Sequence, residues 1–232
     1  RSRGNVKLPV TIRIPFGGGI GSPEHHSESP EAYFAHTAGL RVVSPSNPQD
    51  AYTMLQQAIA DDDPVIFLEP KRRYHVRGEV DTDLVPDPGS LYNAQVVREG
   101  ADLTLIAYGP LVKTAMDAAA AAQDEGIDIE VIDLRSIEPV DFVTLSASVR
   151  KTGRVVIAHE ASKFGGIGAE LAASLTERCF DHLDHAPVRV TGFDIPYPPS
   201  KLEHHHLPDL DRILDGVDRA MRRTGDLLGE EG

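Results

Sequence analysis

The chain of 232 residues contains a single cysteine, Cys179, which excludes an internal disulfide framework and a thiolate metal cluster. It is also short of positive charge, with 23 Lys and Arg against 36 Asp and Glu and a net charge of −13. This deficit argues against nucleic-acid binding and against anchoring on anionic lipid, because both need clustered basic side chains. No apolar run approaches the roughly 20 residues of a transmembrane helix. We therefore expect no nucleic-acid or membrane partner, and one cysteine fits a reducing, cytoplasmic compartment.

The second half of the chain alternates apolar strand-like segments with amphipathic helical segments. Hydrophobic residues make up 41% of the sequence, which is enough for a folded core. Alternating strands and helices form βαβ crossovers, so this half predicts a parallel sheet covered by helices on both faces. Cys179 falls late in an amphipathic helix and is expected in the core. The predicted strands are 103–108, 127–132, 154–159 and 188–191, and the predicted helices are 111–124, 139–151, 166–180 and 209–223.

The first part of the chain has a similar order, arranged around a glycine-rich loop. Ser29, Pro30 and Glu31 form a helix start signal, because Ser caps, Pro suits the first turn and Glu favours the positive end of the dipole. Gly39 is expected to end that helix. Residues 70–93 contain prolines and little periodicity, which is typical of a linker between two α/β units. The predicted strands are 10–14, 40–43 and 65–68, and the predicted helices are 29–39 and 51–60.

The loop at residues 15–28 holds four glycines and two adjacent histidines, His25 and His26. It lacks the GxGxxG and GxxxxGK[ST] patterns, so a phosphate-binding role is not favoured. Histidine can pass protons or bind an anion near neutral pH. Adjacent residues of an extended loop point in opposite directions, so at most one histidine faces any one site. The alternative is that both are ordinary loop residues.

An acidic turn, residues 61–63, follows the predicted helix 51–60. Carboxylates at a helix C-terminus oppose the helix dipole, and a cation held by carbonyl or carboxylate oxygens would relieve this. A solvated acidic turn is the alternative.

His159 and Glu160 lie at the end of the predicted strand 154–159. Ligands favour the carboxyl ends of parallel strands, so these residues are a candidate for a site or an interface. The alternative is that the segment only forms a tight turn into the next helix, at Gly165 to Gly168. Further along, residues 202–206 resemble a purification tag, but they precede another predicted helix and are interpreted as native.

Five long stretches carry a family resemblance: HHSESPEAYFAHTAGLRVVSPSNPQDAY, DPVIFLEPKRRY, VIDLRSIEPVD, GRVVIAHEA and GFDIPYPPSKLE. Together they resemble the beta subunit of the thiamine-diphosphate-dependent decarboxylating component of 2-oxo acid dehydrogenase complexes. The resemblance implies an α/β fold of two parallel or mixed-sheet units. Residues 1–85 match the second half of a transketolase-type pyrimidine-binding domain, 86–100 a linker and 101–232 a transketolase-type C-terminal domain. The family's N-terminal part, with the glutamate that bonds the aminopyrimidine, is expected before residue 1, so this chain alone is expected to be inactive.

The resemblance also implies a reaction: oxidative decarboxylation of a 2-oxo acid with acyl transfer to lipoyl. His26, in the motif HSES, corresponds to the family's catalytic histidine beside the thiazolium ring and is thus both catalytic and cofactor-binding. The stretch HHSESPEAYF favours a branched-chain substrate of the 3-methyl-2-oxobutanoate type. The alternatives are a pyruvate dehydrogenase beta subunit, an assembly module without activity of its own, and another thiamine enzyme such as a transketolase or a deoxyxylulose-phosphate synthase.

The ligands and partners that the resemblance implies are specific. Thiamine diphosphate and Mg²⁺ would be held mainly by an alpha subunit in an α2β2 heterotetramer. The lipoyl domain would visit the site, and the C-terminal domain would dock the acyltransferase core. A structural K⁺ would lie in a set of mainly backbone oxygens. The matching positions are Leu8, Val10, Thr11, Ala58, Asp61 and Asp63.

Overall fold

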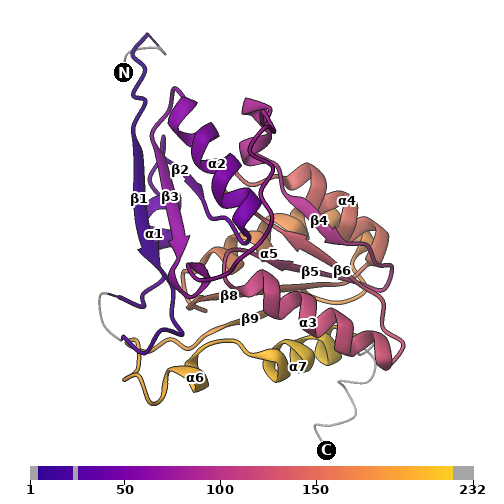
Figure 1. Cartoon of the computed structure of the whole chain (residues 1–232). Helices are drawn as coiled ribbons and strands as arrows, with labels where there is room; N and C mark the ends of the chain where they lie inside the picture. Colours follow the sequence, from indigo (N-terminus) through magenta and orange to yellow (C-terminus); the bar gives the residue numbers. More distant parts are fainter. Residues whose placement is uncertain (1–4, 23–25, 222–232) are drawn as a thin grey trace, which may run out of the picture.

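Two sheets form the frame of the computed structural model, which describes residues 5–22 and 26–221 (Figure 1). Within these residues the first sheet has the order β1-β3-β2-β7. Its first three members run parallel, and β7 is antiparallel to β2. The strands are Thr11–Phe16 (β1), Arg41–Val43 (β2), Val65–Pro70 (β3) and Ser136–Glu138 (β7).

The second sheet has the order β4-β6-β5-β8-β9 and is parallel except for β4. Helices cover both of its faces, as the alternating pattern predicted: α3 and α7 pack on one face, and α4 and α5 on the other (Figure 1). Cys179 is buried in this core, as predicted. The strands are Gln95–Arg98 (β4), Leu103–Ala107 (β5), Ile129–Asp133 (β6), Val155–Ser162 (β8) and Val188–Gly192 (β9). The helices are Leu111–Asp124 (α3), Phe142–Thr152 (α4), Ile167–Cys179 (α5) and Leu210–Met221 (α7).

Within the described residues, two α-helices belong to the first part of the chain, and one is shorter than predicted. In Pro48–Ala60 (α2), the Asn47 side chain accepts a hydrogen bond from Asp50 N at 2.8 Å and caps the first turn. The other helix, Glu31–Ala35 (α1), does not reach Gly39, and Ser29 does not cap it. The chain tightens after Ala35 because Thr37 N bonds Phe34 O three residues back.

Sequence patterns also missed two strands and misplaced one helix start. The helix predicted from Pro139 begins at Phe142, because Asp141 caps it by accepting from Thr144 N at 3.0 Å. The preceding residues form β7, which carries the second half of the chain into the first sheet. The other missed strand is β4 at the edge of the second sheet.

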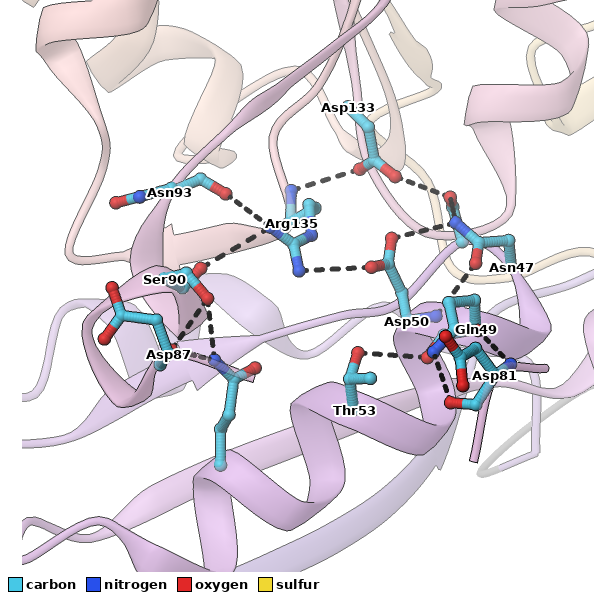
Figure 2. Close-up of polar contacts among 12 residues, drawn as sticks. Asn47, Gln49, Asp50, Thr53, Asp81, Asp87, Ser90, Asn93, Asp133 and Arg135 are labelled. Atoms are coloured by element: carbon cyan, nitrogen blue, oxygen red, sulfur yellow. Dashed lines mark hydrogen bonds and ion pairs between the residues drawn. The ribbon is translucent and has the colours of Figure 1, made fainter. Parts of the chain in front are cut away.

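Arg135 joins the two sheets at a buried polar junction between β6 and β7 (Figure 2). Its guanidinium contacts Asp50 Oδ1 of α2 at 3.1 Å and donates to Asn93 O at 3.0 Å. Its backbone N–H donates to Asp133 Oδ1 at 3.1 Å, and Ser46 Oγ donates to Asp133 Oδ2 at 2.5 Å. The junction therefore ties α2, β6 and the segment before β4 together.

The remaining elements are short. The segment of residues 71–93 lies against α2, where Gln57 Nε2 donates to Ser90 Oγ at 2.8 Å and Asp81 N donates to Gln49 Oε1 at 2.7 Å. None of the helices in the described ranges has the length and apolar character needed to cross a bilayer. The short helices are Lys71–Arg73 (η1), Pro88–Tyr92 (η2), Phe180–His182 (η3) and Glu203–His206 (α6).

Candidate functional site

The glycine-rich loop after β1 lies against the second half of the chain. Gly18 N donates to Glu160 Oε2 at 3.0 Å. Gly19 N and Gly21 N donate to the two carboxylate oxygens of Glu203, at 3.2 and 2.8 Å. Three amides that a phosphate-binding loop would aim at its ligand are thus bonded to protein carboxylates.

Glu160 is the buried anchor of this contact. It lies near the carboxyl end of β8, where the sequence predicted a site or an interface, and its side chain is 3% exposed. Arg72 of η1 pairs with Glu160 Oε1 at 2.6 Å. Burial raises the pKa of Glu160, and the charge of Arg72 and the Gly18 N–H oppose that rise. The charged pair makes this edge an interface between the two halves of the chain.

The loop approaches the second half too closely for larger residues. A Cβ atom at Gly18 would overlap the hydroxyl of Tyr197 and come within 3.0 Å of Leu207. Gly17 has a φ of +85°, which side chains other than glycine rarely adopt. The glycines therefore serve close backbone packing, one of the roles open to them from the sequence.

His26 follows this loop and is exposed. The segment around it is held through its backbone: Lys71 Nζ donates to His26 O, and Gly17 N donates to Glu28 O at 3.1 Å. Its neighbour His25 lies outside the described residues. The structure thus presents the His26 imidazole at the surface beside the seam between the two halves.

A buried polar chain lies behind this segment. Tyr108 Oη donates to Glu31 Oε1 at 2.5 Å, and the Tyr108 ring stacks on His159 with 6.2 Å between centroids. Burial raises the pKa of Glu31 to about 7, and burial lowers the pKa of His159 to about 4. His159 is therefore a neutral acceptor for Gly168 N, at 3.1 Å. From the sequence, Glu31 was predicted only to favour the positive end of the helix dipole, because its contact with Tyr108 spans 77 residues.

A cavity of about 250 Å³ opens along the seam, next to the His26 segment. Residues of that segment form one wall, and β8 with the chain after β9 forms the other. Among its lining residues are Ser27, Ser29, Glu160, Ser162, Tyr197 and His206.

The residues expected to hold potassium lie together at the start of β1 and the end of α2. Thr11 Oγ1 donates to Ala58 O at 2.9 Å. Leu8 N donates to Asp62 O at 3.0 Å, and Val10 N donates to Leu8 O at 2.8 Å. The structure therefore gathers several backbone carbonyls of the predicted set at one place.

The two carboxylates of that set have protein partners. Asp61 accepts from Asp63 N at 2.7 Å and from Tyr92 Oη at 2.5 Å. Asp63 pairs with Arg41 at 2.9 Å. The carbonyl oxygens of the set have protein donors as well: Ala58 O accepts from Thr11 Oγ1, and Leu8 O accepts from Val10 N. No group of three or more His, Cys, Asp or Glu side chains in the described ranges is arranged to hold a metal ion.

Comparison with known proteins assigns the two halves to domains. The family "Transketolase, pyrimidine binding domain" matches residues 1–76, and "Transketolase, C-terminal domain" matches residues 92–213. The chain is 53% identical over 221 residues to the pyruvate dehydrogenase E1 component subunit beta of Leifsonia xyli, covering 95% of this chain and 65% of that protein. It is also 53% identical over 224 residues to the 3-methyl-2-oxobutanoate dehydrogenase subunit beta of Mycobacterium tuberculosis, covering 96% and 64%. The chain belongs to the E1 beta subunits of 2-oxo acid dehydrogenases.

A solved structure supports the fold of this E1 beta chain. It is similar to "Split gene transketolase, inactive beta4 tetramer", with a TM-score of 0.74 and 25% identity over 95% of this chain and 70% of that one. The transketolase-type α/β fold predicted from the motifs is thus confirmed. The chain spans about 65% of the length of the two relatives named above.

Proposed function

We propose that this E1 beta chain acts with an alpha subunit in the oxidative decarboxylation of a branched-chain 2-oxo acid, of the 3-methyl-2-oxobutanoate type, with acyl transfer to lipoyl. The observation that carries the proposal is His26, exposed beside a loop that two carboxylates fix against the C-terminal domain. The similarity to a 3-methyl-2-oxobutanoate dehydrogenase subunit supports the branched-chain assignment. The equal similarity to a pyruvate dehydrogenase subunit makes pyruvate the second candidate.

In this proposal the chain's own contribution is the placement of one imidazole. When bound, thiamine diphosphate supplies the carbon nucleophile and the electron sink for decarboxylation. Lys71 holds the backbone carbonyl of His26. The His26 imidazole gives a proton to the reacting substrate or takes one from it, and it stabilises the charge that develops on the lipoyl group as the acyl group is transferred. An exposed imidazole suits a group that must meet a cofactor and a lipoyl arm supplied by other chains.

The diphosphate and Mg²⁺ belong to the alpha subunit in this proposal. The amides of Gly18, Gly19 and Gly21 already donate to Glu160 and Glu203, so they are not available to bind a phosphate. We further propose an α2β2 heterotetramer in the cytoplasm, a visiting lipoyl domain, and docking of the acyltransferase core on the C-terminal domain. This chain on its own is inactive in the proposal.

The substrate is tested by kinetics of the full-length beta subunit assembled with its alpha subunit. We expect kcat/KM for 3-methyl-2-oxobutanoate to exceed that for pyruvate by at least about 10-fold, since two extra methyl groups in an apolar pocket each favour binding by a similar factor. Both substrates are measured on the same enzyme preparation, so folding and cofactor loading do not affect the ratio of the two kcat/KM values. A ratio that favours pyruvate would assign the chain to the pyruvate branch.

We also propose that K⁺ binds the carbonyl cluster around Thr11 and Ala58 and acts structurally. A ligand that binds only the folded state at 100 times its Kd stabilises it by about 2.7 kcal/mol. Replacing K⁺ by a bulky organic cation at constant ionic strength is therefore expected to lower the melting temperature of the complex and its retention of cofactor. Constant ionic strength separates this effect from general screening of a chain with net charge −13.

The variant Asp61→Asn tests which oxygens bind the cation. Because the Asp61 carboxylate already accepts from Tyr92 Oη and Asp63 N, we expect this variant to keep its stabilisation by K⁺. Loss of the K⁺ effect in Asp61→Asn would instead make the carboxylate a ligand. Equal melting temperatures of the native complex in K⁺ and in the organic cation would show that K⁺ does not bind there.

A further inference from the structure

Beyond the residues that meet the cofactor, two glutamates of the C-terminal domain contact the loop that leads to His26. Glu160 comes from β8 and Glu203 from α6, which lie 142 and 185 residues beyond Gly18 along the chain. Their hydrogen-bonding partners are backbone N–H groups of the loop. Such bonds fix the path of the backbone itself, independently of the loop's side chains.

We propose that Glu160 and Glu203 are positioning residues that hold the His26 segment in its working orientation. The inference rests on the proposed role of His26. Neither glutamate is a catalytic residue in it, because each carboxylate is occupied by the loop and by neighbouring protein groups. Through them the C-terminal domain sets the geometry of a site to which it contributes no catalytic group.

Glu203 holds the outer part of the loop. Its Oε1 accepts from Gly21 N at 2.8 Å, and its Oε2 accepts from Gly19 N at 3.2 Å and from Tyr197 Oη at 2.9 Å. Hydrogen bonds to an ionised carboxylate are roughly twice as strong as neutral ones. Tyr197 fixes the carboxylate from behind, so Glu203 presents its two oxygens to the loop in a defined orientation.

Glu160 holds the inner part of the loop and connects it to η1. It accepts from Gly18 N and pairs with Arg72. The residue before Arg72 is Lys71, whose ammonium donates to His26 O. One short helix is thus tied on one side to the C-terminal domain and on the other to the backbone of the proposed catalytic residue. A shift of Glu160 would move both contacts together.

Displacement of a catalytic group by about 1 Å can cost on the order of 10²-fold in rate. We therefore expect Glu203→Ala, in the full-length beta subunit assembled with alpha, to lower kcat by about 10- to 10²-fold. Glu203→Gln keeps one acceptor oxygen and is expected to recover part of the loss. Glu160→Gln, which removes the negative charge that pairs with Arg72, should lower kcat similarly. Glu125→Gln, at the exposed end of α3, is the matched control and should change nothing.

A double-mutant cycle with His26→Ala separates positioning from a general loss of structure. If Glu203 acts through His26, Glu203→Ala has little further effect on kcat once His26 is alanine. Additive losses in the double variant would overturn the inference. So would native kcat in both Glu203→Ala and Glu160→Gln.

Hydrogen–deuterium exchange of the same complexes gives a readout that does not depend on activity. Glu203→Ala is expected to raise exchange in the loop of residues 17–22 and in the segment that follows His26, with α3 unchanged. Unchanged exchange after His26 would contradict the inference. If His26→Ala has no effect on kcat while Glu203→Ala raises exchange, the proposed function is rejected. The contact between Glu203 and the loop is then still supported.

Discussion

Replacing His26 with alanine in the full-length beta subunit is expected to lower turnover of the proposed α2β2 complex by about 10²- to 10⁴-fold, the usual cost of losing a general acid or base. Assembly should be unaffected, because the segment is held through bonds that alanine retains. Lys71 donates to the backbone carbonyl of residue 26, and Gly17 N donates to Glu28 O. Turnover per assembled tetramer, with the tetramer measured by size-exclusion chromatography, checks both statements.

The control for this variant is His185→Ala. His185 is partly exposed, and its Nδ1 contacts Ala186 O at 2.7 Å, in the turn before β9 and away from the glycine loop. We expect this variant to retain native turnover. If His26→Ala is as mild as His185→Ala, the catalytic assignment is wrong. The assembly-module alternative then becomes the better account of the chain.

Secondary structure was predictable where a segment's own residues determined it. Strands β5, β6 and β8 are mainly apolar and almost wholly buried, and the helices between them repeat their apolar residues with helical spacing. Strand β7 has only three residues, and it exists because β2, more than 90 residues earlier, offers it an edge. No local pattern carries that information, so β7 could not be found from the sequence.

The same limit explains what the sequence missed at the site. The glycine loop and Glu160 were recognised as candidates because glycine runs and strand ends have known uses. Glu203 lay in a stretch that resembled a purification tag, and nothing near it in sequence indicates that it binds Gly19 and Gly21. Glu31 was interpreted only as favouring the helix dipole, although its carboxylate is buried against Tyr108. Each missed contact joins residues that are close only after both halves have folded.

The buried junction at Arg135 should make the largest single contribution to stability among the contacts described here (Figure 2). We expect Arg135→Met to destabilise the fold by about 3–5 kcal/mol, because it leaves the Asp50 carboxylate buried without its charged partner. The two side chains are 12% and 10% exposed, so solvent screens their interaction little. Arg135 has a φ of +55°, and Met tolerates this conformation about as well as Arg, so the comparison isolates the side chain. Urea denaturation of native and variant chains measures the difference.

A surface pair provides the control, and pH provides a second test. Arg219→Met removes an exposed ion pair with Asp215 and is expected to cost about 0–1 kcal/mol. Burial raises the pKa of Asp133 at the same junction to about 7, and the charge of Arg135 opposes that rise. A carboxyl group with a raised folded-state pKa binds more protons when folded, so its contribution to stability is lost as pH rises towards that pKa.

Without Arg135 the pKa of Asp133 should rise further, and the loss of stability with rising pH should extend to higher pH. The gap in unfolding free energy between Arg135→Met and the native chain is therefore expected to be larger at about pH 8 than at about pH 5, where Asp133 is protonated in both folded states. A gap that is the same at both pH values would mean that only the ion pair with Asp50 matters. A gap no larger than that of Arg219→Met would show that the junction does not hold the two sheets together.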